Sequence, residues 1–190
     1  MTRPPFEPVA DRDLRIVSAQ LGRPVRDVVG IAARCVCGAP TVVATAPRLA
    51  DGTPFPTFYY LSHPAATAAM SFLEAAQLMV ECNALLHDDA ELAAGYARAH
   101  EDYLADRARF GEVPEIAGIS AGGMPTRVKC LHAVAAHALA AGPGANPIGD
   151  LALARSSWSP AVCQCADYGV DDEAGDDASS AGEAAGEPGR

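Results

Sequence analysis

Three short runs rich in β-branched and aromatic residues, all in the first third of the chain, constrain its fold most strongly. The runs at 28–34, 41–45 and 55–61 have the composition of β-strands, and turn residues separate them. Pro54 and Pro56 lack the N–H that a strand donates to its neighbour, so the third strand is predicted to begin at a sheet edge. Together the runs predict a small antiparallel sheet.

One short helix is predicted before the sheet and one long helix after it. Residues 11–21 carry apolar side chains at helical spacing, with Asp11 as the N-cap and Gly22 as the stop. Pro64 suits the first turn of a helix, and helical periodicity continues from there to residue 86. The apolar stripe of this helix comprises Phe72, Ala75, Leu78, Met79, Cys82 and Leu85.

Two further helices complete the predicted fold. One begins near residue 88 and buries Tyr96 and Tyr103, and its short joint with the preceding helix predicts an antiparallel hairpin. The other spans residues 126–141, and residues 146–150 are predicted to form a turn. The fold class is therefore α+β: a small antiparallel sheet packed with an N-terminal helix, a helical hairpin and a helix in the C-terminal half.

The charge distribution separates a body from a tail. The chain of 190 residues has 14 basic and 24 acidic residues, a net charge of −10. From residue 166 onward there are eight acids and one base, which gives −7 and leaves −3 for the rest. Such a segment buries too little apolar area to offset its ordering entropy. We predict an irregular N-terminus at 1–10, a single domain at 11–155 and an acidic, disordered tail at 156–190.

The same composition restricts the partners and the compartment. No basic stripe suits duplex nucleic acid, and no apolar run approaches the roughly 20 residues that span a bilayer. The first residues lack the apolar core of a signal peptide, so we expect a cytoplasmic protein. In a reducing compartment its six cysteines favour metal binding or burial over disulfides.

Cysteine and histidine residues at the ends of predicted elements suggest a metal site. Zinc takes about four ligands from Cys, His and carboxylate side chains, and we expect zinc here. Successive side chains of a strand point to opposite faces, so Cys35 and Cys37 both ligate only if Val36 lies in a turn. The alternative for these thiols is burial as small hydrophobic side chains. The predicted ligands are Cys35, Cys37, His63 and Cys130.

Helix geometry limits what the segment around Cys130 contributes to one ion. On a straight helix Cys130 and His137 lie about 10 Å apart along the axis, farther than two ligands of one zinc. His132 lies about 200° from Cys130 around the same helix. We therefore place His132 and His137 next to the ligands rather than among them. Cys163 and Cys165, at the border of the tail, are predicted to have an accessory role.

A glycine-rich loop before the same helix suggests an anion site. Backbone N–H groups, two basic side chains and a helix N-terminus hold phosphate or carboxylate in many proteins. The spacing is not that of a P-loop, and an ordinary connecting loop is the alternative. The predicted anion-binding residues are Ser120, Gly122, Gly123, Arg127 and Lys129.

Two groups of motifs in this chain occur together in a known family. They are Arg34-Cys35 with Gly38 and Pro40, the segments 47–49, 51–57, 120–125 and 127–132, His137, and the segment 146–149. These motifs resemble the bacterial DUF501 family, found mainly in actinobacteria. The resemblance covers about residues 10–155, and its most specific part is Val128-Lys129-Cys130-Leu131-His132. Similar proteins often carry a cysteine where this chain has His63.

The resemblance implies no assigned activity, and two functions stay open. Genes of the family often neighbour those of enolase, a septum-formation protein and an exopolyphosphatase, which associates it with division or phosphate metabolism. The first function is a metal-binding protein, with zinc preferred and a small anionic ligand at the glycine-rich loop. The second is a non-enzymatic interaction protein of cell division with buried structural cysteines and an unidentified protein partner.

Overall fold

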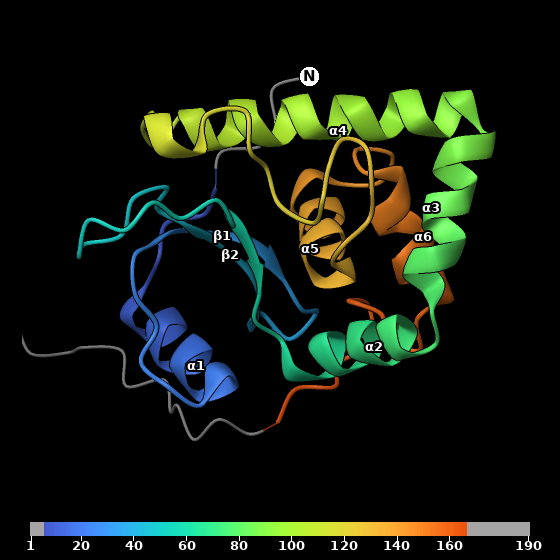
Figure 1. Ribbon diagram of the computed structural model, residues 1–190. Helices are drawn as coiled ribbons and strands as arrows, with labels where there is room; N and C mark the ends of the chain where they lie inside the picture. The colour runs from blue at the N-terminus through green and yellow to red at the C-terminus, as the bar shows by residue number, and fades with distance from the viewer. Residues whose placement is uncertain (1–5, 167–190) are drawn as a thin grey trace, which may run out of the picture.

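The computed structural model describes residues 6–166, and its centre is a three-stranded antiparallel sheet. The strands are β1 (Val28–Arg34), β2 (Pro40–Thr45) and β3 (Tyr59–Leu61), with β2 in the middle (Figure 1). The described residues also form six α-helices. The predicted α+β class with a small antiparallel sheet is therefore confirmed.

Strand β3 is shorter than predicted, because it begins at Tyr59 rather than at residue 55. Pro54 and Pro56 have no N–H for a ladder, as expected. The N–H between them, that of Phe55, donates at 2.8 Å to the carbonyl of Pro47, just beyond the end of β2, and Arg48 and Pro54 form an isolated antiparallel bridge. The residues before Tyr59 therefore form an irregular edge segment.

Both faces of the sheet are covered, which explains why every residue of β2 is buried. Alternate side chains of a strand point to opposite faces. Val43 packs with Val17 of α1 (Asp11–Leu21), whereas Val42 and Ala44 belong to the larger cluster around α5 (Leu131–Ala141). Figure 1 shows α1 and α5 on opposite sides of the strands. The sheet is thus the middle layer between two helices.

Helix α1 ends as predicted but begins one residue earlier than expected. Its N-cap is Ala10, so Asp11 is the first helical residue and not the cap. Asp13 replaces the predicted cap, since its carboxylate accepts a hydrogen bond from the Ala10 N–H at 3.2 Å. At the other end Gly22 adopts the left-handed conformation, with φ 65°, that glycine reaches without strain.

Asp13, which is buried, also forms an ion pair with Arg34, whose side chain is partly exposed. Asp13→Ala is therefore expected to cost about 2 kcal/mol of stability, less than the loss of one partner from a fully buried pair. Two guanidinium nitrogens of Arg34 donate to the carboxylate, at 2.7 and 3.0 Å. This hydrogen bond, chiefly, holds the pKa of Asp13 below its ordinary value of 3.8.

The lowered pKa fixes the pH dependence of this contribution. A carboxyl group whose pKa is lower in the folded state stabilises the fold fully above its unfolded pKa, and the contribution is lost as pH falls through the folded pKa. Urea unfolding should therefore separate the variant from wild type at neutral pH, and the separation should shrink below about pH 3. Asp11→Ala, at an exposed position of the same helical turn, is the control. An equal difference at both pH values contradicts the assignment.

The predicted helix over 64–86 is wrong in one respect, because it consists of two helices. These are α2 (Pro64–Ala75) and α3 (Leu78–Asp88), separated at Gln77, which has a left-handed φ of 67°. No glycine or proline marks the break, so tertiary packing sets it: Leu78, directly after it, is buried. Phe72, expected in the apolar stripe, is 73% exposed, because α2 buries the face that carries Met70 and Leu73 instead.

Helix α4 (Ala90–Ala108) runs across the top of the molecule in Figure 1 and meets α3 at a corner, so the two helices do not lie side by side as the predicted antiparallel hairpin required. The corner is capped by Asp89, whose carboxylate accepts hydrogen bonds from two backbone N–H groups of the first turn of α4. Tyr96 and Tyr103 of α4 are fully buried, as predicted. The Tyr103 hydroxyl accepts hydrogen bonds from the N–H groups of Phe58 and Tyr59, and so fixes β3 relative to α4.

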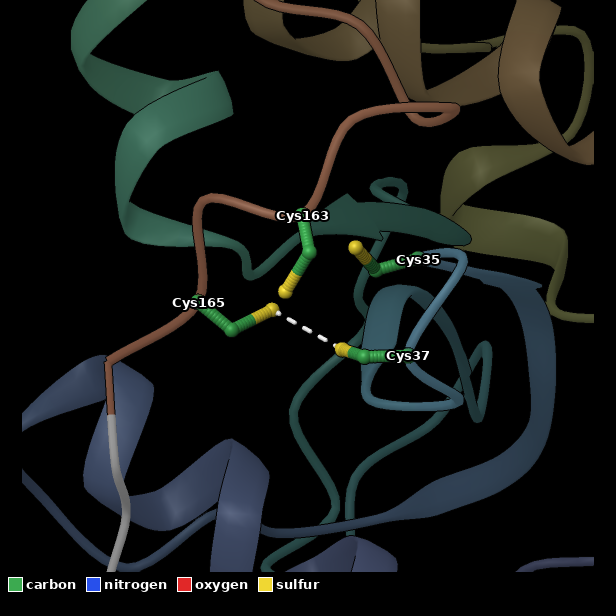
Figure 2. Close-up of side chains that lie close together, drawn as sticks. All are labelled: Cys35, Cys37, Cys163 and Cys165. Atoms are coloured by element: carbon green, nitrogen blue, oxygen red, sulfur yellow. Dashed lines mark hydrogen bonds between the residues drawn. The ribbon is translucent and has the colours of Figure 1, made fainter.

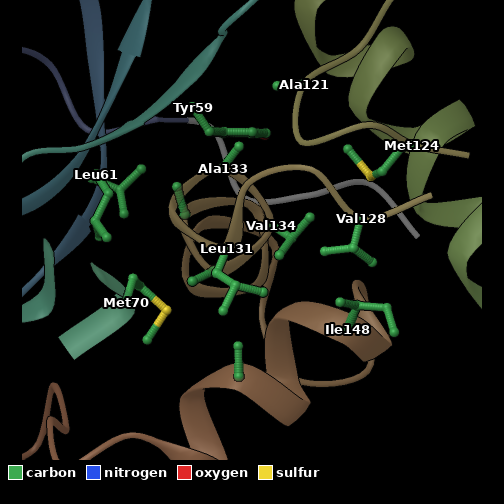
Figure 3. Packing of buried hydrophobic residues seen from close by; sticks show 14 of the residues in the cluster. Tyr59, Leu61, Met70, Ala121, Met124, Val128, Leu131, Ala133, Val134 and Ile148 are labelled. Atoms are coloured by element: carbon green, nitrogen blue, oxygen red, sulfur yellow. The ribbon is translucent and has the colours of Figure 1, made fainter. Parts of the chain in front are cut away.

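Helix α5 begins at Leu131, five residues later than predicted. The N–H groups before it are engaged elsewhere: that of Val128 donates to Asn83 at 2.8 Å, and that of Lys129 donates to the Gly122 carbonyl at 2.7 Å. Side chains of α5 and of its neighbours on all sides fill the main core, which Figure 3 shows around this helix.

Residues 147–155, beyond the core helix, form α6 (Pro147–Arg155), where only a turn was predicted. Asn146 caps this helix, because its side-chain oxygen accepts the Gly149 N–H at 2.9 Å. Pro147 occupies the first helical position, where its missing N–H costs no hydrogen bond.

Residues 156–166 still pack on the body, although the tail was predicted to begin at 156. Trp158 is buried, with 3% of its surface exposed, and the Val36 N–H donates to the Pro160 carbonyl at 3.1 Å. The prediction of a disordered tail at 167–190 lies outside the described residues. Within residues 6–166 no helix is long and apolar enough to cross a membrane.

Candidate metal centre

The turn between β1 and β2 carries Cys35 and Cys37. The Cys35 N–H donates to the Ala39 carbonyl and the Gly38 N–H to the Cys35 carbonyl, at 2.9 and 2.8 Å. Gly38 adopts a φ of 87°, which suits glycine, and its carbonyl accepts a hydrogen bond from the Arg34 guanidinium. Val36 therefore lies in a turn, and Figure 2 shows both cysteine side chains reaching the same space.

Cys163 and Cys165, from the segment after α6, meet this turn. The four sulfur atoms of Cys35, Cys37, Cys163 and Cys165 all lie within 4.8 Å of one another, and we name these residues the four-cysteine cluster (Figure 2). The sulfurs of Cys37 and Cys165 are 3.4 Å apart, and all four thiols are free. Burial and the neighbouring thiols raise the pKa of Cys165 well above its ordinary value.

The cluster suits a tetrahedral thiolate site. With Zn–S bonds near 2.3 Å, neighbouring sulfurs of such a site lie about 3.8 Å apart, which is close to the spacing here. Thiolates select soft or borderline ions such as zinc over magnesium and calcium. Cys35 is buried, whereas Cys37 and Cys163 lie at the surface, so an ion from solvent reaches the site without opening the core.

His63, a predicted ligand, lies beside the cluster rather than in the group of four. It is fully buried and caps α2, with its Nδ1 accepting the Ala66 N–H at 3.4 Å. Because Nδ1 accepts, we assign the ring proton to Nε2, which lies 3.2 Å from the Cys165 sulfur. Burial lowers the pKa of His63 and keeps the ring neutral. His63 is therefore placed to donate a hydrogen bond to a ligand sulfur.

Cys130, the fourth predicted ligand, is not brought to the cluster. It belongs to a second group with His132 and Glu74, whose donor atoms also lie within 4.8 Å of one another. The Cys130 sulfur is 3.7 Å from His132 Nδ1, and that nitrogen is 3.1 Å from a carboxylate oxygen of Glu74. The hydrogen bond with Cys130 and the nearby charges raise the pKa of His132 to about 9, against the effect of burial.

The predicted angle of about 200° between Cys130 and His132 around one helix does not apply, because Cys130 lies before the helix. Cys130 precedes α5 as its N-cap, with extended backbone angles of φ −151° and ψ 115°. Its side chain therefore turns back toward His132 of the first helical turn. His137, in contrast, is fully buried in the core, stacked on Tyr59 with ring centres 5.4 Å apart and 3.2 Å from Asn146.

The glycine-rich loop packs against α5 instead of preceding it directly. A Cβ on Gly122 would lie 2.8 Å from Val134, and one on Gly123 would lie 2.6 Å from the Arg127 carbonyl. Both glycines also have positive φ, so close packing and backbone conformation explain them.

The Arg127 and Lys129 N–H groups donate to the carbonyls of Gly123 and Gly122, so these two N–H groups are not available to an anion. Ser120 is buried, with its hydroxyl 2.8 Å from His100, whereas Arg127 and Lys129 are exposed. Because α5 begins only at Leu131, the predicted helix N-terminus does not stand directly behind the loop. Binding of a small anion there stays a prediction.

Three residues of these two groups, Cys163, Cys165 and Glu74, were not predicted as ligands from the sequence. Cys163 and Cys165 repeat the spacing of Cys35 and Cys37, and that repetition was the available signal. Glu74 was missed altogether. Thr67, Ser71 and Glu74 recur at helical spacing in the otherwise apolar α2, and such a polar stripe indicates a common polar contact.

Comparison with known families gives one result. The family model described as "Protein of unknown function (DUF501)" matches residues 31–154. No curated protein and no solved structure matches the chain. Cys35, Cys37 and Cys130 lie inside the matched region, whereas Cys163 and Cys165 lie beyond its end. The match covers most of the structured region, and the chain belongs to the DUF501 family.

Proposed function

We propose that this protein binds a zinc ion through Cys35, Cys37, Cys163 and Cys165. The observation that carries the proposal is the mutual proximity of four free sulfurs from two segments more than a hundred residues apart in the chain. The two pairs share one spacing, and a turn in the first pair allows both of its sulfurs to face one ion. His63 supports the site by donating to the Cys165 thiolate, as groups behind metal ligands commonly do.

The role of this zinc is structural. Four thiolates complete a tetrahedral shell, and structural zinc sites are closed in this way, whereas catalytic sites keep an open position. The segment it holds, residues 156–166, contributes Trp158 to the core and Pro160 to the turn between β1 and β2. The ion therefore fastens the end of the folded body to the sheet.

Disulfide formation is the competing use of the same thiols. Cys37 and Cys165 are close enough to approach bonding distance with a small movement. A disulfide, however, joins sulfurs in pairs, whereas here each of the four sulfurs has all three others within 4.8 Å. One zinc ion would bind all four sulfurs at once, whereas a disulfide joins only two of them.

Substitution of cobalt for zinc tests this proposal. Cobalt(II) bound by four thiolates should give intense sulfur-to-metal charge-transfer absorption, with the tetrahedral ligand-field bands. Cys163→Ser should lose most of this absorption. Cys130→Ser, the same change at a cysteine outside the cluster, should retain it. Absence of the tetrathiolate spectrum in reduced wild-type protein, or equal spectra of the two variants, contradicts the proposal.

A further inference from the structure

We propose that Glu74, Cys130 and His132 form a second zinc site, separate from the four-cysteine cluster, with an open coordination position that faces a cavity. The three residues come from two elements. Glu74 lies near the end of α2, and Cys130 and His132 lie at the start of α5. The proposal does not depend on the four-cysteine cluster, because the two groups share no residue.

The separations of the donor atoms match those of zinc ligands. Around a tetrahedral zinc, nitrogen and oxygen ligands lie about 3.3 Å apart, and nitrogen and sulfur ligands about 3.5 Å apart. His132 Nδ1 lies 3.1 Å from the Glu74 oxygen and 3.7 Å from the Cys130 sulfur. One ion at the centre of this group therefore reaches all three atoms with little movement. The chemistry of the set, one thiolate, one imidazole and one carboxylate, is that of zinc sites.

The surroundings orient the ligands as they do in metal sites. A histidine that binds metal through one nitrogen usually donates its other N–H to a carbonyl or carboxylate. His132 Nε2 lies 3.1 Å from the Thr67 carbonyl and 3.1 Å from the Ser71 hydroxyl, which leaves Nδ1 toward the proposed ion. The Glu74 oxygen accepts the Leu131 N–H at 2.7 Å, so the carboxylate is also held in place.

The cavity supplies the reason to expect an exchangeable ligand. Cys130 and His132 line a cavity of about 410 Å³, together with Thr57, Gly122 and Ala133. Glu74 and His132 each keep a quarter of the side chain exposed, so solvent reaches the site. Three protein ligands and one open position are the arrangement of catalytic zinc sites, in which water or an anionic oxygen group occupies the fourth place. The ligand class is thus a small oxygen donor that fits this cavity.

The same atoms also suit a metal-free arrangement. A protonated His132 would donate from Nδ1 to Glu74 and from Nε2 to Thr67, and Cys130 would then be a thiol beside an imidazolium. In that arrangement no zinc ion covers the Cys130 sulfur, so added zinc leaves its reaction with an alkylating reagent unchanged. The reactivity of Cys130 toward an alkylating reagent, with and without zinc, distinguishes the two arrangements.

Zinc stoichiometry and thiol alkylation, both measured on the full chain, test the proposal. Wild-type protein should bind two zinc equivalents, His132→Ala and Cys130→Ser one each, and Cys163→Ser one. Ser71→Ala, which alters a neighbour of His132 but removes no proposed ligand, should still bind two. Mass spectrometry of the Cys130 peptide should show that alkylation is suppressed with zinc bound and returns after chelation, because the thiolate that reacts is the one that binds the metal.

Alkylation on wild-type protein needs no substitution, so the test holds even where a variant fails to fold. Cys130 alkylation at one rate with and without zinc overturns the proposal and assigns the group to a thiol–imidazolium pair. Two equivalents retained by a folded His132→Ala protein also overturn it. If only the four-cysteine cluster fails to bind metal, the result is different. The tetrathiolate cobalt spectrum is then absent, and zinc still protects Cys130 from alkylation.

Discussion

The Cys35→Ser variant is expected to lose zinc from the four-cysteine cluster and to melt about 8–16 °C below wild type. A ligand present at a thousand times its dissociation constant stabilises a fold by about 4 kcal/mol, and each kcal/mol shifts the melting temperature of a chain this size by about 2–4 °C. Cys35 is the most buried cysteine of the cluster, so serine in its place removes both a ligand and a packed side chain.

Trp158 offers a local measurement of the same loss. It is the only tryptophan, it is buried, and its ring centre lies 5.5 Å from that of His63 beside the cluster. Release of residues 156–166 should shift its fluorescence to longer wavelength, both in Cys35→Ser and in chelated wild type. Val36→Ala is the matched control, since Val36 lies between the two cysteines and is exposed. Unchanged melting and emission after complete metal removal contradict the structural role.

The second large effect is expected from Gly149→Ala, which should destabilise the protein by about 3 kcal/mol or prevent folding. Gly149 lies in the first turn of α6, where that helix packs directly against α5. A Cβ there would lie 2.7 Å from the Ala138 Cβ and closer still to the Val134 carbonyl oxygen. Because α5 is the centre of the core, the two helices separate only by disturbing packing on all sides.

Chemical denaturation of Gly149→Ala measures this cost directly. Ala154→Gly, at an exposed position of the same helix, is the control and should cost only the helix propensity difference of about 1 kcal/mol. If Gly149→Ala is as stable as wild type, the close crossing of α5 and α6 is wrong.

The elements predicted correctly are those whose local signals agree with their packing. Strand β1 has the β-branched composition of a strand, and helix α1 combines helical periodicity with a clear stop at Gly22. The failures have the opposite origin. The break at Gln77 has no sequence signal, and α6 was hidden by Asn146 and Pro147, which suit a helix start as well as a turn.

The site was predicted only in part, for a related reason. Cys35 and Cys37 sit in a recognisable turn, but their partners follow a segment whose low apolar content resembles the adjoining tail. Pairing between two ends of a chain is a property of topology, which local patterns do not contain. Cys130 was expected inside a helix that begins at residue 126. Because α5 begins five residues later, Cys130 instead has an extended backbone directly before the helix. That shift brought His132 and Glu74 to Cys130.

X-ray absorption at the zinc edge identifies the atoms that bind zinc in the four-cysteine cluster. The zinc-loaded Cys130→Ser protein isolates the four-cysteine cluster from the second proposed site. We expect a single shell of four sulfur atoms at about 2.3 Å from zinc. A shell that contains nitrogen or oxygen at about 2.0–2.1 Å, or a reduced protein that holds no zinc, contradicts this expectation.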